Sequence, residues 1–247
     1  MEPASWVFQV MWTPIYILGA ITLVWSTRPS MREWAQSNST WALPANYLAN
    51  ALYLVLLLGE YGGLWPAVAV ILCVIIPTLI YAHRRLHVGA AYAKCVTDGV
   101  PYFEAAVVHT YVSMYLGWAC VAALETVVLA LIPPSRSETK DVGLSPVLLM
   151  VAAQVAAAAV GAAALVRIGD AAFAAPIATG LIAIGTHQLN RSGPGYGLAI
   201  PYAALALGPL LLVAALAIAA RRIHVGCSSR FMCAAATAQE EKKALLS

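Results

Sequence analysis

The sequence predicts an all-α membrane protein, a polytopic bundle of seven transmembrane helices. Hydrophobic residues make up 62% of the 247-residue chain and charged residues only 10%, with a mean hydropathy of +0.79. Soluble domains carry about 25% charged residues. The apolar residues also gather in seven separate stretches, most of them close to the roughly 20 residues that a helix needs to cross a bilayer. We therefore expect an integral, multi-pass membrane protein, although the sequence does not identify the membrane.

Each stretch has its own support. The first, at 6–25, has no charged residue and carries Trp6 and Trp25 at its ends, as in interfacial aromatic belts. The second, at 42–58, places Asn46 and Asn50 one turn apart on one face. The third, at 64–82, contains Pro77, which transmembrane helices tolerate. The fourth, at 107–132, is the longest and carries most of the polar chemistry.

The remaining three helices are expected at 144–166, 171–186 and 198–220, followed by a polar tail at 221–247. The sixth is the shortest of the seven and contains Pro176. A bundle that crosses the membrane seven times places its loops alternately on two sides. One side would hold eleven Lys and Arg residues and the other only Arg136, Lys140 and Arg191. Cytosolic loops are the positive ones, so the sequence predicts an outer N-terminus and a cytosolic C-terminus.

The fourth helix presents a chemically distinctive face. Tyr111, Tyr115, Trp118 and Glu125 follow one another at helical spacing, which puts them on one side of the helix. A charge at the centre of the bilayer costs about 2.5–3.5 kcal/mol on insertion scales. We therefore expect Glu125 to face the interior, either as a functional carboxylate or as a protonated group bonded to a neighbouring helix. His109, near the helix end, is expected at the interface.

Other helices supply residues that could complete a ligand site with this face. Trp12 and Tyr16 lie on the first helix, and Asn50 and Tyr53 on the second. Aromatic walls with a few polar groups are typical of small-molecule sites. The alternative is that these side chains only stabilise helix packing.

Two features point to further contacts. Ser113 and Gly117 form a small-xxx-small step that favours close approach of another helix, and a homodimer through this face is one candidate partner arrangement. Cys227 and Cys233 lie beside a basic juxtamembrane segment, where palmitoylation occurs; the alternative is two unmodified thiols.

Several classes are disfavoured. The stretch 198–220 has no lysine for a retinal Schiff base, the histidines are scattered without an HExxH metal motif, and no Gly-x-Ser-x-Gly element is present. We expect no catalytic residues, no metal site and no nucleic-acid partner, and hence not an enzyme.

Three segments of the first half resemble the TspO/MBR family of tryptophan-rich sensory or translocator proteins. They are residues 3–16 (PASWVFQVMWTPIY), 47–53 (YLANALY) and 116–122 (LGWACVA), in the family's order and spacing, so the resemblance covers about 3–131. It implies a helix bundle that binds a porphyrin, haem, sterol or similar flat apolar molecule between helices. Where the family often has Asn shortly after the Ala of the third segment, this chain has Glu125 and Thr126, which puts that part of the site in doubt.

These observations lead to one expected function and one alternative. We expect an integral membrane protein that binds a small apolar ligand between its helices, with a sensory or carrier role. The alternative is a proton-coupled small-solute transporter in which Glu125 carries the proton, since intramembrane carboxylates and broken helices are typical of transporters.

Overall fold

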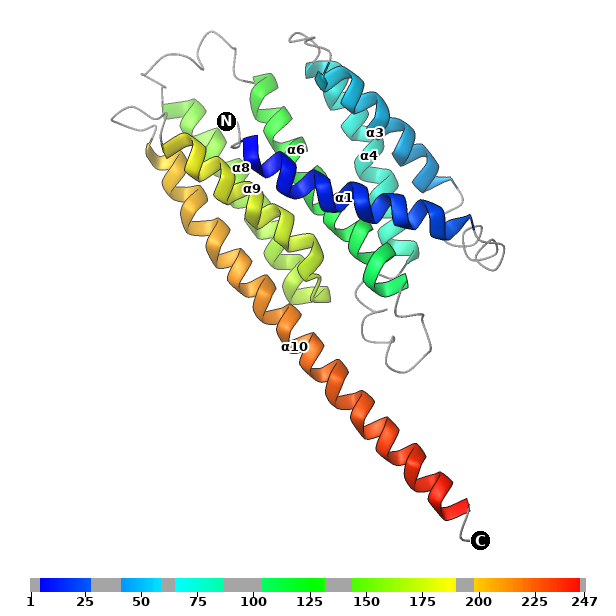
Figure 1. Ribbon diagram of the computed structural model, residues 1–247. Coiled ribbons are helices and arrows are strands. Elements are labelled where there is room, and N and C mark those ends of the chain that lie inside the picture. The colour runs from blue at the N-terminus through cyan, green and yellow to red at the C-terminus, as the bar shows by residue number, and fades with distance from the viewer. Residues whose placement is uncertain are drawn as a thin grey trace.

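The computed structural model is built from helices and describes residues 5–27, 41–58, 65–86, 104–131, 144–189 and 198–244 (Figure 1). No strand occurs in these ranges, which confirms the all-α prediction. The helices are α1 (Ser5–Ser26), α3 (Ala42–Leu58), α4 (Trp65–Arg85), the π-helix η2 (Glu104–His109), α6 (Thr110–Leu131), α8 (Leu144–Ile168), α9 (Ala171–Leu189) and α10 (Ala199–Ala244).

Most helix bounds lie within three residues of the predicted stretches; the fourth and the last stretches differ in other ways. The prediction 42–58 coincides with α3, and the sixth stretch extends three residues farther, to Leu189. The fourth predicted helix is divided, because its first residues belong to η2 and the regular α-helix starts only at Thr110. A π-helical turn is not visible in a hydrophobic pattern, since it changes backbone pairing and not composition.

The last helix continues beyond the membrane part that the sequence predicted. Its candidate span, Ala199–Arg222, agrees with the predicted 198–220. Helix α10 as a whole runs for 46 residues, from Ala199 to Ala244, into the segment expected as a polar tail. Figure 1 shows its second half projecting away from the bundle. Arg221 and Arg222 mark the end of the apolar segment, but the residues that follow include many Ala, Gln, Glu and Lys, which are good helix formers.

Six of the described helices are long and apolar enough to cross a membrane: α1, α4, η2 with α6, α8, α9 and the first part of α10. Helix α3 has 17 residues and is therefore about 26 Å long, slightly less than the roughly 30 Å of a hydrocarbon core.

The helices pack in two groups that meet between α6 and α9. Helices α3, α4 and α6 form one group, and α8, α9 and α10 form the other. Helix α1 lies across this junction and contacts α6, η2 and α9 (Figure 1). Small residues permit the closest approach. A Cβ at Gly117 of α6 would lie 2.2 Å from the Phe173 carbonyl oxygen of α9, so the two backbones touch here.

Candidate functional site

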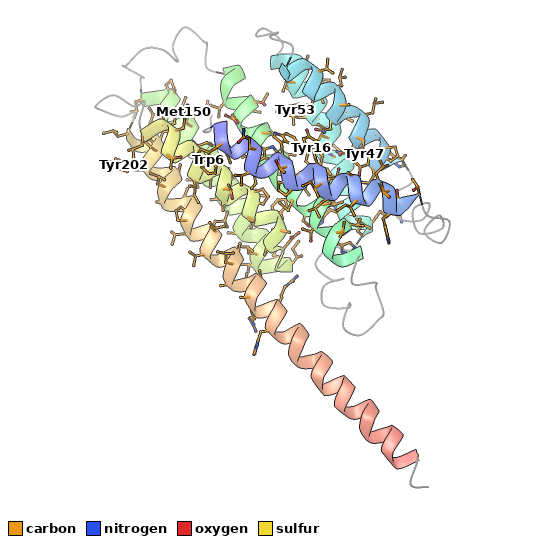
Figure 2. The ribbon with its side chains drawn as sticks, in the orientation of Figure 1. Trp6, Tyr16, Tyr47, Tyr53, Met150 and Tyr202 are labelled. Atoms are coloured by element: carbon orange, nitrogen blue, oxygen red, sulfur yellow. The ribbon has the colours of Figure 1, made fainter. Side chains whose placement is uncertain are left out.

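An aromatic cluster occupies the space between α1, α3 and α6. Helix α6 contributes Tyr111, Tyr115 and Trp118, which are each at most 3% exposed. These three follow at spacings of four and three residues, so the regular helix from Thr110 onward turns them all to the same side. In the same group of helices, Figure 2 shows Tyr16 of α1 near Tyr47 and Tyr53 of α3.

Trp12 is the centre of this cluster. Its ring stacks on Tyr16 at a centroid distance of 5.1 Å, and it meets Tyr115 and Trp118 edge to face at 5.9 and 6.1 Å. Tyr53 lies tilted at 6.3 Å. Offset and edge-to-face pairs at these distances are the favoured aromatic arrangements, each worth about 0.5–1.5 kcal/mol beyond area burial. One side chain of α1 therefore joins the aromatic residues of α3 and α6.

Asn50 provides the polar group inside the cluster. Its Oδ1 accepts a 2.6 Å hydrogen bond from the Tyr115 hydroxyl, and its Nδ2 donates to the Tyr16 hydroxyl at 3.5 Å. Asn50 is buried while Tyr16 is 38% exposed. The hydrogen-bonded row thus runs from the interior at Tyr115 to the outer surface of the bundle at Tyr16.

A second aromatic layer lies beside the first. Tyr47 stacks on Tyr111 with centroids 6.1 Å apart, and its hydroxyl donates to the Gly19 carbonyl of α1 at 3.1 Å. A Cβ at Gly19 would lie 3.0 Å from the Tyr111 ring. The glycine therefore lets α1 approach α6 closely enough for both contacts.

Glu125 lies farther along α6, at the other side of the cluster from Tyr111. Its side chain is half-buried, and it lies seven residues, about two turns, beyond Trp118 on the same helix. The structure brings together seven of the eight side chains that the sequence placed in a ligand site, from three helices: Trp12, Tyr16, Asn50, Tyr53, Tyr111, Tyr115 and Trp118.

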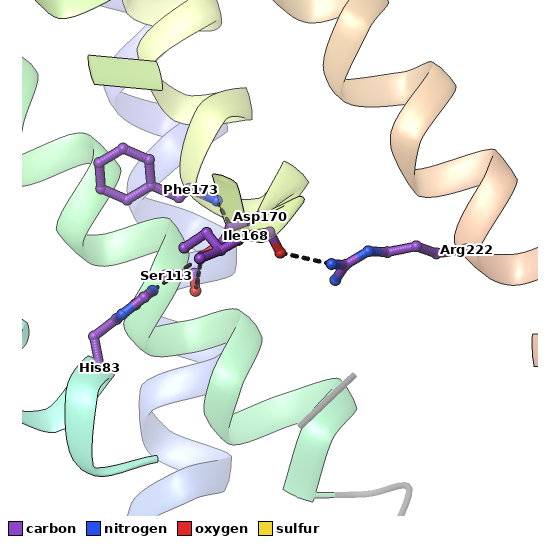
Figure 3. A network of polar contacts seen from close by, with 6 residues as sticks. All are labelled: His83, Ser113, Ile168, Asp170, Phe173 and Arg222. Atoms are coloured by element: carbon purple, nitrogen blue, oxygen red, sulfur yellow. Dashed lines mark hydrogen bonds and ion pairs between the residues drawn. The ribbon is translucent and has the colours of Figure 1, made fainter. Parts of the chain in front are cut away.

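A second polar network lies in the turn between α8 and α9, and the sequence did not predict it. Asp170 is 2% exposed. Its Oδ2 accepts from the Ser113 hydroxyl at 2.7 Å and lies 3.0 Å from His83 Nε2, while its Oδ1 accepts from the Phe173 N–H at 3.0 Å (Figure 3).

Together with a contact from Arg222, this network joins five helices: α4, α6, α8, α9 and α10. Asp170 caps the N-terminus of α9, where a negative charge is favoured by the helix dipole. Gly169 precedes it with φ of 62°, a left-handed conformation that favours glycine. On the other side of the turn, Arg222 of α10 donates to the Ile168 carbonyl at 2.6 Å and so satisfies the end of α8 (Figure 3). The side chains from α4, α6 and α10 thereby hold the α8–α9 turn in place.

A profile of the family described as TSPO-like protein matches residues 1–217, which is most of the chain. The chain belongs to the TSPO-like protein family. The TSPO-like match extends well beyond the segment 3–131 on which the sequence resemblance rested, so it includes α8, α9 and the membrane part of α10 as well as the aromatic cluster. With its six candidate spans, this TSPO-like protein is an integral, multi-pass membrane protein. No curated protein and no solved structure matches it.

The fold bears on two sequence expectations for the TSPO-like chain. The close approach expected at Ser113 and Gly117 is made within the chain, to α9, through Asp170 and the Phe173 carbonyl, while a homodimer through this face stays a prediction. His109, expected at the interface, is 1% exposed and lies inside the bundle, because η2 packs against α1.

Two other expectations remain as they were. The side chains of Cys227 and Cys233 lie outside the described part of the structure, so palmitoylation there stays a prediction. Among the described residues, no three His, Cys, Asp or Glu side chains gather into a group that could hold a metal ion.

Proposed function

We propose that this TSPO-like protein binds a flat apolar molecule, porphyrin- or sterol-like, between α1, α3 and α6, in a sensory or carrier role and not as an enzyme. The observation that carries the proposal is the convergence of Trp12, Tyr115 and Trp118 around the hydrogen-bonded Asn50. Such a site offers aromatic faces for stacking and one amide for orienting a polar edge of the ligand. Haem is a candidate on the same grounds.

The arrangement of α1 suggests how a ligand reaches this site from the bilayer. Tyr16 is 38% exposed and stacks directly on Trp12, so the outer edge of the cluster lies at the lipid-facing surface. Helix α1 is held to α3 largely through side chains, including the Tyr47 hydroxyl and the weak Asn50–Tyr16 contact at 3.5 Å. We propose that a small outward movement of α1 lets the ligand replace the ring contacts of Trp12.

We further propose that all seven α-helices cross the membrane, with the N-terminus outside and the C-terminus in the cytosol. All described Lys and Arg residues lie at the end of the bundle that holds the α8–α9 turn, or along α10 beyond it. Protease accessibility of tags placed at the two termini of oriented vesicles tests this directly. Tags that are cleaved from the same side would exclude an odd number of crossings.

The binding proposal is tested by titrating the detergent-purified protein with a porphyrin and, separately, with a sterol, while tryptophan fluorescence is recorded. Asn50→Leu and Glu125→Gln leave every tryptophan in place, so changes in affinity are not confused with loss of the reporter. We expect saturable quenching that weakens about tenfold in Asn50→Leu, because one hydrogen bond contributes about 0.5–1.5 kcal/mol. Trp118→Phe should also weaken binding.

Tyr202→Phe is the matched control, since Tyr202 is 60% exposed on α10, outside the aromatic cluster. It should bind as the unmodified protein does. Quenching that rises linearly without saturation and is equal in all variants would indicate partition into detergent, and the binding proposal would then be abandoned.

The alternative function, a proton-coupled transporter, is favoured by one observation. Glu125 is half-buried inside a membrane helix, on the helix that supplies Tyr111, Tyr115 and Trp118 to the proposed ligand site. In liposomes, a transporter would give pH-dependent solute flux that Glu125→Gln abolishes. A binding protein would give no flux in either form.

A further inference from the structure

One end of the bundle gathers the arginines of three helices, α4, α8 and α10. His83 of α4 and Arg222 of α10 both reach the α8–α9 turn, at Asp170 and Ile168. The residues adjacent to these contacts in sequence are Arg84 and Arg85, Arg167, and Arg221, and all four are exposed. We call these four side chains, Arg84, Arg85, Arg167 and Arg221, the basic rim.

The acid at this end does not neutralise the basic rim. Asp170 is 2% exposed and is already bonded to Ser113, His83 and the Phe173 N–H. It is the only acid at this end whose side chain the structure describes; Glu104 opens η2 here as well. With Arg222, the backbone ranges at this end therefore carry five arginines against two acids, and the positive charge faces outward while the described negative charge faces inward.

Aromatic side chains lie beside part of the basic rim. The Arg85 guanidinium lies over the Tyr81 ring, 5.4 Å from its centroid, and Arg85 Nε donates to the Tyr81 hydroxyl at 3.1 Å. Trp41, which immediately precedes α3 and is 55% exposed, also contacts Tyr81. The centroids of the two rings are 5.3 Å apart. Exposed Trp and Tyr beside Arg are typical of the headgroup layer. In such a layer, Arg85 would lie beside lipid phosphate groups.

We propose that the basic rim binds anionic phospholipid headgroups, so that this end of the protein collects acidic lipids from the surrounding leaflet. The choice of partner rests on charge complementarity. The arginines are distributed over α4, α8 and α10, so they can each pair with a different phosphate of a lipid surface, whereas one soluble anion would reach only some of them. Guanidinium groups pair with phosphate through two parallel hydrogen bonds. A juxtamembrane basic residue contributes about 1 kcal/mol near an anionic leaflet, which corresponds to about a fivefold change in binding.

The test measures the relative affinity of the full-length protein for two lipids in vesicles. The protein is reconstituted in phosphatidylcholine containing a fixed minor fraction of either brominated phosphatidylglycerol or brominated phosphatidylcholine, and tryptophan quenching is compared. Trp41 reports from this end of the bundle. The test variant replaces Arg84, Arg85, Arg167 and Arg221 with Gln; the control is Lys242→Gln with Lys243→Gln, which lies about 30 Å farther along α10.

We expect phosphatidylglycerol to quench the unmodified protein and the control more strongly, and this preference to fall at least fivefold in the four-residue variant and on raising the salt concentration. Equal quenching by the two lipids in the unmodified protein would overturn the proposal, as would an unchanged preference in the variant. If soluble glycerol phosphate removes the preference, the rim binds free phosphate and not a lipid surface, which also refutes it. Should the four-residue variant not fold, Arg84→Gln with Arg167→Gln gives the same comparison.

Discussion

Substituting Gly117 with alanine tests the contact between the two helix groups. A methyl group at this position would lie 2.2 Å from the Phe173 carbonyl oxygen and 3.1 Å from its carbonyl carbon. Real Cβ contacts are essentially never shorter than 3.0 Å, so the atoms overlap by at least 0.8 Å. The obstacle is backbone in the first turn of α9, which Asp170 caps. It cannot rotate away, and α6 and α9 must therefore separate.

Overpacking of this kind costs about 1–3 kcal/mol. Alanine also favours a helix over glycine by about 1 kcal/mol, which would hide part of the loss. Gly180→Ala is the matched control because it has the same propensity gain at the same helix junction. Its methyl would lie 3.0 Å from Val121 Cγ1, a side-chain atom that can move. The difference between the two variants therefore isolates the steric cost.

The assay is thermal unfolding of both variants in the same detergent. For a chain of about this size, 1 kcal/mol shifts Tm by about 2–4 °C. We expect Gly117→Ala to unfold about 2–12 °C below Gly180→Ala. If Gly117→Ala unfolds at the same temperature as Gly180→Ala, or higher, α6 and α9 do not touch at this point and the reasoning fails.

Three further predictions concern the polar contacts. Asp170→Ala should destabilise the protein by about 3–5 kcal/mol in denaturant unfolding, because it leaves several buried donors without an acceptor, whereas Asp170→Asn should cost clearly less; equal losses would argue against the capping role. Asn50→Leu should cost about 1–3 kcal/mol by leaving the Tyr115 hydroxyl buried and unpaired, and adding Tyr115→Phe should restore part of that loss in a double-mutant cycle; strictly additive effects would contradict the hydrogen bond. Arg222→Gln should lower Tm through the Ile168 carbonyl, while Arg221→Gln, exposed beside it, should stay within about 0.5 kcal/mol of the unmodified protein; the reverse order would reject the contact.

The sequence predicted the helices and the aromatic face because both depend on local patterns. An apolar stretch bounded by polar residues locates a membrane helix, and the spacing of Tyr111, Tyr115 and Trp118 determines a common side. A polar residue on the same side, such as Glu125, then indicates that this side faces the interior, because a charged group is unfavourable in contact with lipid. These inferences need no knowledge of which helices are neighbours.

The contacts of Asp170 could not be inferred in this way. His83 lies 87 residues before it and Ser113 lies 57 residues before it, so no local pattern links them. Ser113 and Gly117 did indicate a close approach, but the choice between α9 and a second chain depends on the tertiary fold. The continuation of α10 was missed for another reason. The apolar segment ends at Arg221, and the prediction used apolar residues to locate helices, but a helix can continue through polar residues.

Because α10 is long, a small tilt near its start would move its far end by a large distance. Its 46 residues extend for about 69 Å without a break in the helix, and Pro209 lies inside its membrane part. A tilt of about 10° at that proline would displace the far end by roughly 9 Å, since about 35 residues follow it at 1.5 Å each. Movements within the bundle that are too small to resolve by most methods would thus appear at Ala244 as displacements the size of a helix diameter.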